Sequence, residues 1–447
     1  MNPIDAPSPE TAPDTPLRRR DLLASALGIA CLAATNDAAS QSVTDMPASS
    51  RELWQWARTQ PVLEPYVAQL DTASGGPTLR AAMATEYRAR EQQTLQLATR
   101  VGNGYWGTES TRLATRFGQW LGCDADELVF TRGAGEALAI VANGLDLAGG
   151  DEVLTTTREH PAALSPWLVQ ARRRGIVVKQ IALPAPLAGP EQALGLLAGA
   201  ITDRTRALMF SHVNYADGTL MPVRELCQFA RSRNIVTVVD GAQAVGMLDF
   251  LVRDLDCDCY AASFHKWVNG SHGTGALFIK REMLDRLWPS APRGLDAVPP
   301  IDTPTQAPGF VDAPAALHRM GNIVPLVWPA LRGSEAAIEF QQQIGRSRIE
   351  ARIRELAIYA RLRLQQLPGA DLLTPARPGL WGGIVTLRLP GRPADMLATT
   401  LVNVQRVYAR AIKWSGTNEG ALRVSLHIHN THDEIDKLLL GLQQARL

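Results

Sequence analysis

The stretch IVTVVDGAQAVG, residues 235–246, places Asp240 directly after a run of β-branched and apolar residues. Such a run predicts a short strand that is buried on both faces and ends before Gly241. A carboxylate at this position needs a cation or a hydrogen-bond donor, because a buried charge is costly without one. Asp240 could simply form the turn before Gly241. The other interpretation is that it serves a ligand at the end of the strand.

Similar apolar runs occur between about Leu79 and Leu287, separated by helical patterns. The runs are found at residues 152–155, 207–210, 235–239 and 275–279. Alternation of this kind predicts an α/β fold with a mostly parallel, doubly wound sheet. Ligands of such sheets bind beyond the carboxyl ends of the strands, which is where Asp240 is expected.

A lysine follows 26 residues after this aspartate, in the segment Ser263-Phe264-His265-Lys266-Trp267. Lysine is scarce in the chain, which has 447 residues but lysines only at positions 179, 266, 280, 413 and 437. An aspartate and a lysine in this order are what a pyridoxal phosphate site requires. The lysine forms a Schiff base, and the carboxylate keeps the pyridine nitrogen protonated.

A site for the phosphate is predicted in TRGAGEALAIVANGL, residues 131–145. A turn of small residues, Gly133-Ala134-Gly135, precedes a helix that begins near Glu136. Backbone amides at a helix start bind anions, although most glycine-rich turns are only turns. Ser263 and His265 flank the lysine and could donate to the same phosphate.

The order of these motifs resembles the class V aminotransferase family, fold type I pyridoxal phosphate enzymes that include cysteine desulfurases and isopenicillin N epimerase-like proteins. The resemblance runs from about residue 70 to the C-terminus. Its motifs are LDTASGG, TRGAGEAL, TREHPAAL, SHVNYADGT, VDGAQAVG, SFHKWVNGSHGTGALF and ALRVSLHIHNTHDEIDKL. It implies a large domain with a mixed, mostly parallel seven-stranded sheet and a smaller α+β C-terminal domain. The overall similarity favours the isopenicillin N epimerase-like branch.

The resemblance also implies roles for individual residues around the cofactor ring. Lys266 would form the Schiff base and Asp240 would pair with the pyridine nitrogen. Gln243 would bond the phenolic oxygen, and Asn214 would contact the same region. His160 would stack on the ring face. Without the resemblance, His160 is a loop residue before a proline and Asn214 is a turn residue.

Further roles concern the phosphate and the substrate. The implied phosphate contacts are Gly133, Ala134, Gly135, Ser263 and His265. Ala134 stands where relatives often have threonine. Thr274 would reach the phosphate of a neighbouring subunit, which implies a homodimer. Arg423 would bind a substrate carboxylate through its two-pronged guanidinium, or could pair with any surface acid.

A metal site is the alternative interpretation of the histidines near the C-terminus. His427 and His429 share one face of a predicted strand, and His432 follows. No acidic or cysteine ligand stands beside them in an obvious geometry, and they fall inside the family's C-terminal motif. We therefore predict no metal.

The amino terminus is predicted to lie outside the fold. Arg19-Arg20 followed by Leu22-Leu23 resembles a twin-arginine signal, and residues 22–34 form a short apolar run that is too short to span a bilayer. We predict a signal peptide at 1–40, export by the twin-arginine translocase and a periplasmic location; the alternative is a disordered tail on a cytosolic protein. The domain prediction is 78–330 for the large domain, with 51–77 and 331–447 in the small one.

The amino-acid composition limits the classes of partner that the protein is expected to bind. The net charge of +1 and 46% hydrophobic residues indicate a globular protein with no charge excess for nucleic acid. The five cysteines show no CxxC pair, and Cys31 falls in the signal segment.

A helical region is expected from 331 to 367 with a break near Gly345.

The sequence specifies the reaction type less closely than it specifies the cofactor. Cysteine desulfurases need a nucleophilic cysteine shortly before the carboxylate-binding arginine, and VYARAIKWSGTNEGALR, residues 407–423, has none. Epimerisation, transamination and carbon–heteroatom elimination stay open, on an amino acid or a peptide-like substrate, siderophore tailoring included. A binding protein that kept the fold without the cofactor would be expected to lose Lys266 or Asp240, and both are present.

Overall fold

The computed structural model describes residues 46–47, 49–96, 105–290, 320, 324–413 and 420–445. The predicted signal segment and Cys31 lie outside these residues, as does most of the proline-rich connection after residue 290. Residues from Pro47 onward form one compact unit. Among the helices of the described part, none is long and apolar enough to cross a membrane.

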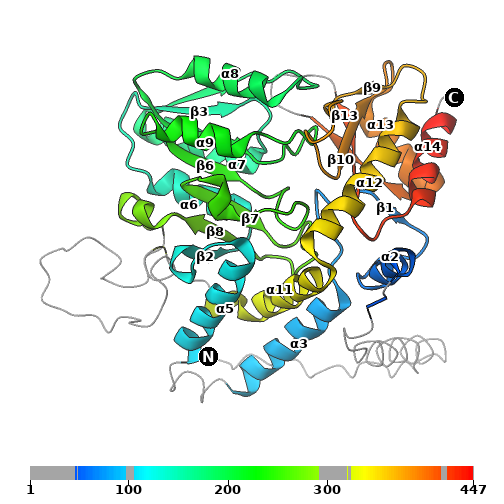
Figure 1. The fold of residues 1–447 in the computed structure, drawn as a ribbon, viewed down its shortest axis with the longest axis horizontal. Coiled ribbons are helices and arrows are strands. Elements are labelled where there is room, and N and C mark those ends of the chain that lie inside the picture. Colours follow the sequence, from blue (N-terminus) through cyan, green and yellow to red (C-terminus); the bar gives the residue numbers. More distant parts are fainter. Residues whose placement is uncertain are drawn as a thin grey trace, which may run out of the picture. The chain divides into compact units, whose positions relative to one another are not determined.

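The largest sheet of this unit has seven strands (Figure 1). The strands follow the order β2-β8-β7-β6-β5-β3-β4, and β8 is the one that runs antiparallel to its neighbours. Their bounds are β2 Leu128–Thr131, β3 Glu152–Thr156, β4 Val177–Ile181, β5 Thr205–Ser211, β6 Val236–Asp240, β7 Cys259–Ser263 and β8 Gly275–Ile279. The predicted fold class is confirmed.

Helices connect these strands and cover the sheet. They are α6 (Ala134–Gly144), α7 (Pro161–Arg174), α8 (Pro190–Ala200) and α9 (Val223–Arg231). Apolar residues of α6 and α7, such as Leu138 and Trp167, pack in one buried cluster with strand residues such as Val238. Burial on both faces explains why the central strands read as unbroken apolar runs. Strand β7 was not among the predicted runs, because Cys-Tyr-Ala-Ala-Ser has weak strand propensity and depends on its neighbours.

The C-terminal part carries a smaller antiparallel sheet with the order β12-β13-β10-β9. A second apolar cluster fills the space between this sheet and its helices. The bounds are β9 Asp371–Leu372, β10 Ile384–Arg388, β12 Arg410–Ile412, β13 Ala421–Ser425, α12 Arg346–Leu364, α13 Ala394–Thr400 and α14 His432–Gln444. The strand that was predicted to carry His427 and His429 corresponds to β13, but it ends at Ser425, before both histidines.

The N-terminal segment joins the C-terminal part. Strand β1 (Ala68–Gln69) pairs in parallel with β11 (Val407–Tyr408). In helix α2 (Ser50–Thr59), Arg58 forms an ion pair of 2.7 Å with Glu434 of α14. These contacts agree with the assignment of 51–77 to the smaller domain, and the domain boundaries themselves stay a prediction.

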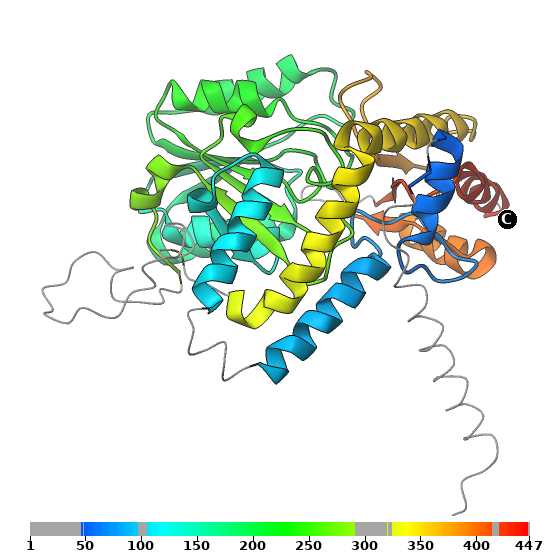
Figure 2. The same ribbon diagram turned by 60° about the horizontal axis from the view of Figure 1, so that its bottom comes forward.

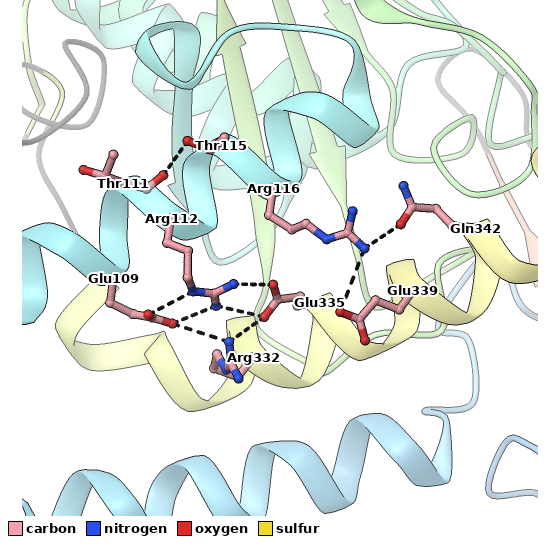
Figure 3. A network of polar contacts seen from close by, with 9 residues as sticks. All are labelled: Glu109, Thr111, Arg112, Thr115, Arg116, Arg332, Glu335, Glu339 and Gln342. Atoms are coloured by element: carbon pink, nitrogen blue, oxygen red, sulfur yellow. Dashed lines mark hydrogen bonds and ion pairs between the residues drawn. The ribbon is translucent and has the colours of Figure 1, made fainter. Parts of the chain in front are cut away.

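Three further helices lie together beside the large sheet, α3 (Arg80–Leu95), α5 (Tyr105–Leu121) and α11 (Val324–Ile344) (Figure 2). Gly345, with φ +93°, separates α11 from α12, as the sequence predicted. Arg112 of α5 contacts Glu109 at 2.8 Å and Glu335 of α11 at 2.6 Å (Figure 3). Arg332 of α11 contacts both glutamates and completes the network.

Candidate active site

A cavity of about 690 Å³ opens at the carboxyl ends of the central strands. Ser211, Asp240 and Ser263 are the last residues of β5, β6 and β7, and all three line it. Residues of β12 and β13 line the cavity as well. A volume of this size suits a small-molecule ligand, and the place is where open α/β sheets bind one.

Most of the predicted site residues meet in this cavity. The predicted residues that line it are Gly133, Ala134, Gly135, His160, Asp240, Gln243, Ser263, His265, Lys266 and Arg423. Asn214 and Thr274 do not line it. The fold therefore brings these residues from distant segments of the chain into one cavity, as a shared ligand site requires.

Lys266 lies on a loop directly after β7, and the N-terminal segment packs against that loop. The backbone N–H of Gly76 donates to the His265 carbonyl at 2.9 Å, and the Asn269 amide donates to the Pro77 carbonyl at 2.9 Å. A Cβ atom at Gly76 would lie 1.9 Å from the Lys266 carbonyl oxygen, so only glycine fits there. Burial lowers the pKa of the Lys266 ammonium, although the Asp240 carboxylate opposes that shift. The amine is thereby easier to deprotonate than an exposed lysine.

Asp240 is buried at the end of β6. One carboxylate oxygen, Oδ1, accepts from the backbone N–H of Ala242 at 2.9 Å. Within the described part of the chain, Oδ2 has no hydrogen-bond donor. That oxygen can accept from a cationic N–H group in the cavity.

Glu159 is a second buried carboxyl group beside Asp240, and sequence analysis missed it. Its oxygens accept from the Thr156 hydroxyl at 2.6 Å and the Ser211 hydroxyl at 2.5 Å. Burial, with a contribution from the charge of Asp240, raises the pKa of Glu159 to about 7. Its position directly before His160 in TREHPAAL was the available signal.

His160 caps the start of α7. Its Nδ1 accepts from the backbone N–H of Ala162 at 3.1 Å, so the neutral ring carries its proton on Nε2. Burial and the nearby Lys266 ammonium lower the pKa of His160. The edge of the ring packs against Tyr215, with centroids 4.9 Å apart at 81°. The geometry presents a neutral imidazole at the cavity wall.

Gln243 is fixed from two sides. Its amide nitrogen donates to the Ala73 carbonyl at 2.9 Å, and its amide oxygen accepts from the Trp267 indole N–H at 2.7 Å. The second N–H of the amide is still available to a ligand. Trp267 therefore positions Gln243 in addition to packing.

The turn before α6 forms a cradle of donors. Gly133 has φ +154°, and a Cβ atom there would lie 3.4 Å from the His265 ring. The Ala134 N–H donates to the Ser263 oxygen at 3.0 Å, so the hydroxyl proton of Ser263 is free to point elsewhere. Nδ1 of His265 is buried and has no partner among the described residues. A helix start, a hydroxyl and an imidazole together match a phosphate group.

Asn214 and Thr274 are the two predicted site residues that do not line the cavity, and their predicted roles stay predictions. The Asn214 side chain accepts from the Ala216 N–H at 3.0 Å, as a turn residue does, while its neighbour Tyr215 lines the cavity. The Thr274 hydroxyl is fully buried, donates to the Ser271 carbonyl at 2.6 Å and contacts the Ser334 hydroxyl at 2.8 Å. These contacts lie within one subunit, and the contact of Thr274 with the phosphate of a neighbouring subunit stays a prediction.

Arg423 is buried on β13 and already has partners. It contacts Asp71 at 2.8 Å, the Ser74 hydroxyl at 2.7 Å and the Tyr215 carbonyl at 3.0 Å. Sequence analysis included Arg423 but missed Asp71, Ser74 and Tyr215. Asp71 and Ser74 stand in LDTASGG and Tyr215 in SHVNYADGT, so the family motifs were the only signal.

The histidines considered for a metal have other surroundings. His427 contacts the Trp267 carbonyl at 2.8 Å, and its ring lies 5.2 Å from that of His429. His432 lies 3.2 Å from Glu355 at the surface. Within the described residues, no three histidine, cysteine or acidic side chains are placed to share a metal ion.

Fold and site together define a class. A seven-stranded sheet of this order, matched by solved structures, is that of the fold type I enzymes. The match to the aminotransferase class V family covers residues 81–438, and the chain belongs to that family. It is an enzyme family that uses pyridoxal phosphate.

Individual relatives agree with this assignment. Isopenicillin N epimerase of Streptomyces clavuligerus is 33% identical over 86% of this chain and 96% of the relative. Cysteine desulfurase of Salmonella agona (strain SL483) is 31% identical over 71% of this chain and 77% of the relative. A solved C-DES mutant with glycine covalently linked to its pyridoxal phosphate has a TM-score of 0.73 at 21% identity, over 85% and 97% of the two chains. At this identity the solved structure supports the fold alone.

Proposed function

We propose that this protein is a pyridoxal phosphate-dependent enzyme of the epimerase type, acting at the amino-bearing α-carbon of an amino acid or a peptide-like substrate. The observation that carries the proposal is a single cavity that holds Lys266, Asp240 and an anion cradle at the start of α6. The similarity to isopenicillin N epimerases, which extends over most of both chains, supports the epimerase type.

The residues of the cavity fit the cofactor. The phosphate would be held by the Gly133–Gly135 turn with Ser263 and His265, whose buried Nδ1 has no other partner among the described residues. Asp240 would accept the pyridine N–H through Oδ2, and Gln243 would donate its second amide N–H. When bound, pyridoxal phosphate withdraws electrons from the α-carbon and makes its proton acidic.

Lys266 would move that proton at its Nζ atom. Burial lowers the pKa of Lys266, and this shift favours the neutral amine that a base needs. Epimerisation also needs a second acid or base on the opposite face of the α-carbon. Tyr215 and His160 line the cavity and touch each other, so they are the candidates for that group.

Persulfide chemistry is disfavoured by the position of the cysteines. The last cysteine in the sequence is Cys259, so no thiol precedes Arg423 in the C-terminal part. The described cysteines are all buried, and none of them lines the cavity. The relation to cysteine desulfurases therefore concerns the family and not the sulfur step.

Export to the periplasm belongs to the proposal as well. The support is the Arg19-Arg20 motif, which lies outside the described residues. A cofactor that is loaded in the cytoplasm requires a route for folded proteins, and the twin-arginine translocase is such a route.

The test is a purified protein incubated with pyridoxal phosphate. The wild-type protein should turn yellow and show the absorption band of a Schiff base, and Lys266→Ala should lose that band. Candidate amino acids are then incubated in deuterated water. Racemisation with deuterium at the α-carbon supports the epimerase, and a keto acid product indicates transamination. A protein that stays colourless with added cofactor would sink the enzyme proposal.

A further inference from the structure

The guanidinium of Arg423 has partners on the side that faces away from the cavity. Asp71 is buried, lies 2.8 Å from Nη2 and does not line the cavity. The Tyr215 carbonyl takes a hydrogen of Nη1 at 3.0 Å. Nε is buried and has no acceptor within the described residues. The positive charge is therefore balanced on the side that faces the protein.

Ser74 occupies the cavity side of the same guanidinium. Its Oγ accepts from Nη2 of Arg423 at 2.7 Å and donates to Oδ1 of Asp71 at 3.0 Å. Ser74 is exposed and lines the cavity, unlike Asp71. With Asp71 and Ser74 both bound, Nη2 has no hydrogen left.

This saturation limits how a carboxylate can bind. A guanidinium binds a carboxylate with two parallel hydrogen bonds along one of two edges of its plane. One edge presents Nη1 and Nη2 and the other presents Nε and Nη2, so both use Nη2, the terminal nitrogen that lies away from Cδ. Of its two contacts, only the one with Ser74 faces the cavity. A carboxylate that binds Arg423 in this way has to take the place of the Ser74 oxygen.

We propose that Ser74 is a ligand of the substrate carboxylate: it yields its place on Nη2 and turns its hydroxyl from Asp71 to the incoming carboxylate. Asp71 stays on Arg423 and holds the guanidinium in place. A carboxylate then receives hydrogen bonds from Arg423 and Ser74, whereas an amide offers a single acceptor oxygen. Ser74 thus selects for a free carboxylate next to the reacting carbon, an inference that rests on the proposed function of the cavity.

The test uses propionate, which lacks an amino group and cannot react, and propionamide as its neutral counterpart. Binding to the cofactor-loaded protein is measured by titration calorimetry. Ser74→Ala should weaken propionate binding about tenfold, as expected for the loss of a hydrogen bond to a charged group. Ser74→Thr keeps the hydroxyl and should restore most of the affinity, and propionamide binding should not change between the variants.

Two results would overturn the assignment. One is a Ser74→Ala protein that binds propionate as tightly as the wild type or more tightly, and the other is a wild type that does not bind propionate. Ser74→Gly also removes the hydroxyl and gives the same comparison if Ser74→Ala does not fold. Cofactor absorption is recorded in parallel, because a missing band indicates failure of the proposed function and not of the Ser74 assignment.

Discussion

Burial and nearby charges shift the pKa values of residues in and beside the cavity. Lys266, His160 and Glu159 all have pKa values shifted toward the neutral form of the side chain, and burial is the largest cause in each case. Neutral groups of this kind can move protons near neutral pH, which Lys266 needs for its proposed role. Asp240 is then the principal negative charge available to a pyridine nitrogen.

Glu159 leads to a prediction about pH. Its folded-state pKa of about 7 lies above the ordinary value of 4.5, so the folded state binds the proton more tightly than the unfolded state. The resulting stabilisation is complete below pH 4.5 and is lost as the pH rises through 7. Relative to Glu159→Gln, the free energy of unfolding of the wild type should fall by roughly 3 kcal/mol between about pH 4 and 8.

Urea unfolding of both proteins at a series of pH values provides the measurement. His212, with a pKa lowered by burial to about 3, destabilises the fold in acid, but it does so in both proteins and cancels in the difference. A difference that does not change with pH would mean that Glu159 titrates normally.

At the scale of elements, the N-terminal segment 71–76 packs against the candidate active site. Residues 71–76 lie between Arg423 of β13 and the loop that carries Lys266, through the contacts of Asp71, Ala73 and Gly76. The segment also follows β1, which pairs with β11 in the C-terminal part. Through Asp71 and Gly76, the segment therefore connects β13 of the smaller sheet with the loop that follows β7 of the larger sheet.

Gly76→Ala tests this packing. The new methyl group would lie 1.9 Å from the Lys266 carbonyl oxygen, so the loop has to move and the site should bind pyridoxal phosphate at least about tenfold more weakly. The matched control is Gly75→Ala, where the nearest atom is 3.8 Å away, and which should bind normally. Titration with the cofactor, followed by absorbance, measures both. Equal affinity of the two variants would contradict the close approach.

The network of α5 and α11 gives a second prediction at this scale. Arg112→Gln leaves Glu109 and Glu335, both buried, with Arg332 as their remaining cation partner, and should lower the free energy of unfolding by roughly 2 kcal/mol. Arg116 on the same helix lies 3.9 Å from the exposed Glu339. Arg116→Gln is therefore the control and should cost no more than about 0.5 kcal/mol. Urea denaturation distinguishes them, and similar losses would argue against the network.

For the whole molecule, export is the property most open to test. Arg19→Lys combined with Arg20→Lys should leave the protein in the cytoplasm, because the twin-arginine translocase reads the paired arginines. Cell fractionation followed by immunoblotting compares it with the wild type. A wild-type protein found only in the cytoplasm would refute the periplasmic location. The homodimer stays a prediction as well, and sedimentation analysis would measure the oligomeric state.

Much of the fold could be predicted from local patterns. Strands β3, β5, β6 and β8 are apolar runs, and Gly345 marked the helix break. Strand β7 was missed because its small residues carry no periodic signal and form a strand only between β6 and β8. Asn214 and Thr274 do not line the cavity, because a motif gives the order of residues but not which side chain faces a cavity.

The sequence alone determined the strand that ends in Asp240, the lysine loop after it and the small-residue turn before α6. These are local features, since each depends on residues within one short segment. The tertiary structure decided the rest. Asp71 and Arg423 stand 352 positions apart and meet only because β1 and β13 belong to one packed unit. The shifted pKa values of Glu159 and Lys266 likewise arise from burial by distant segments, since water is excluded only after the chain has folded.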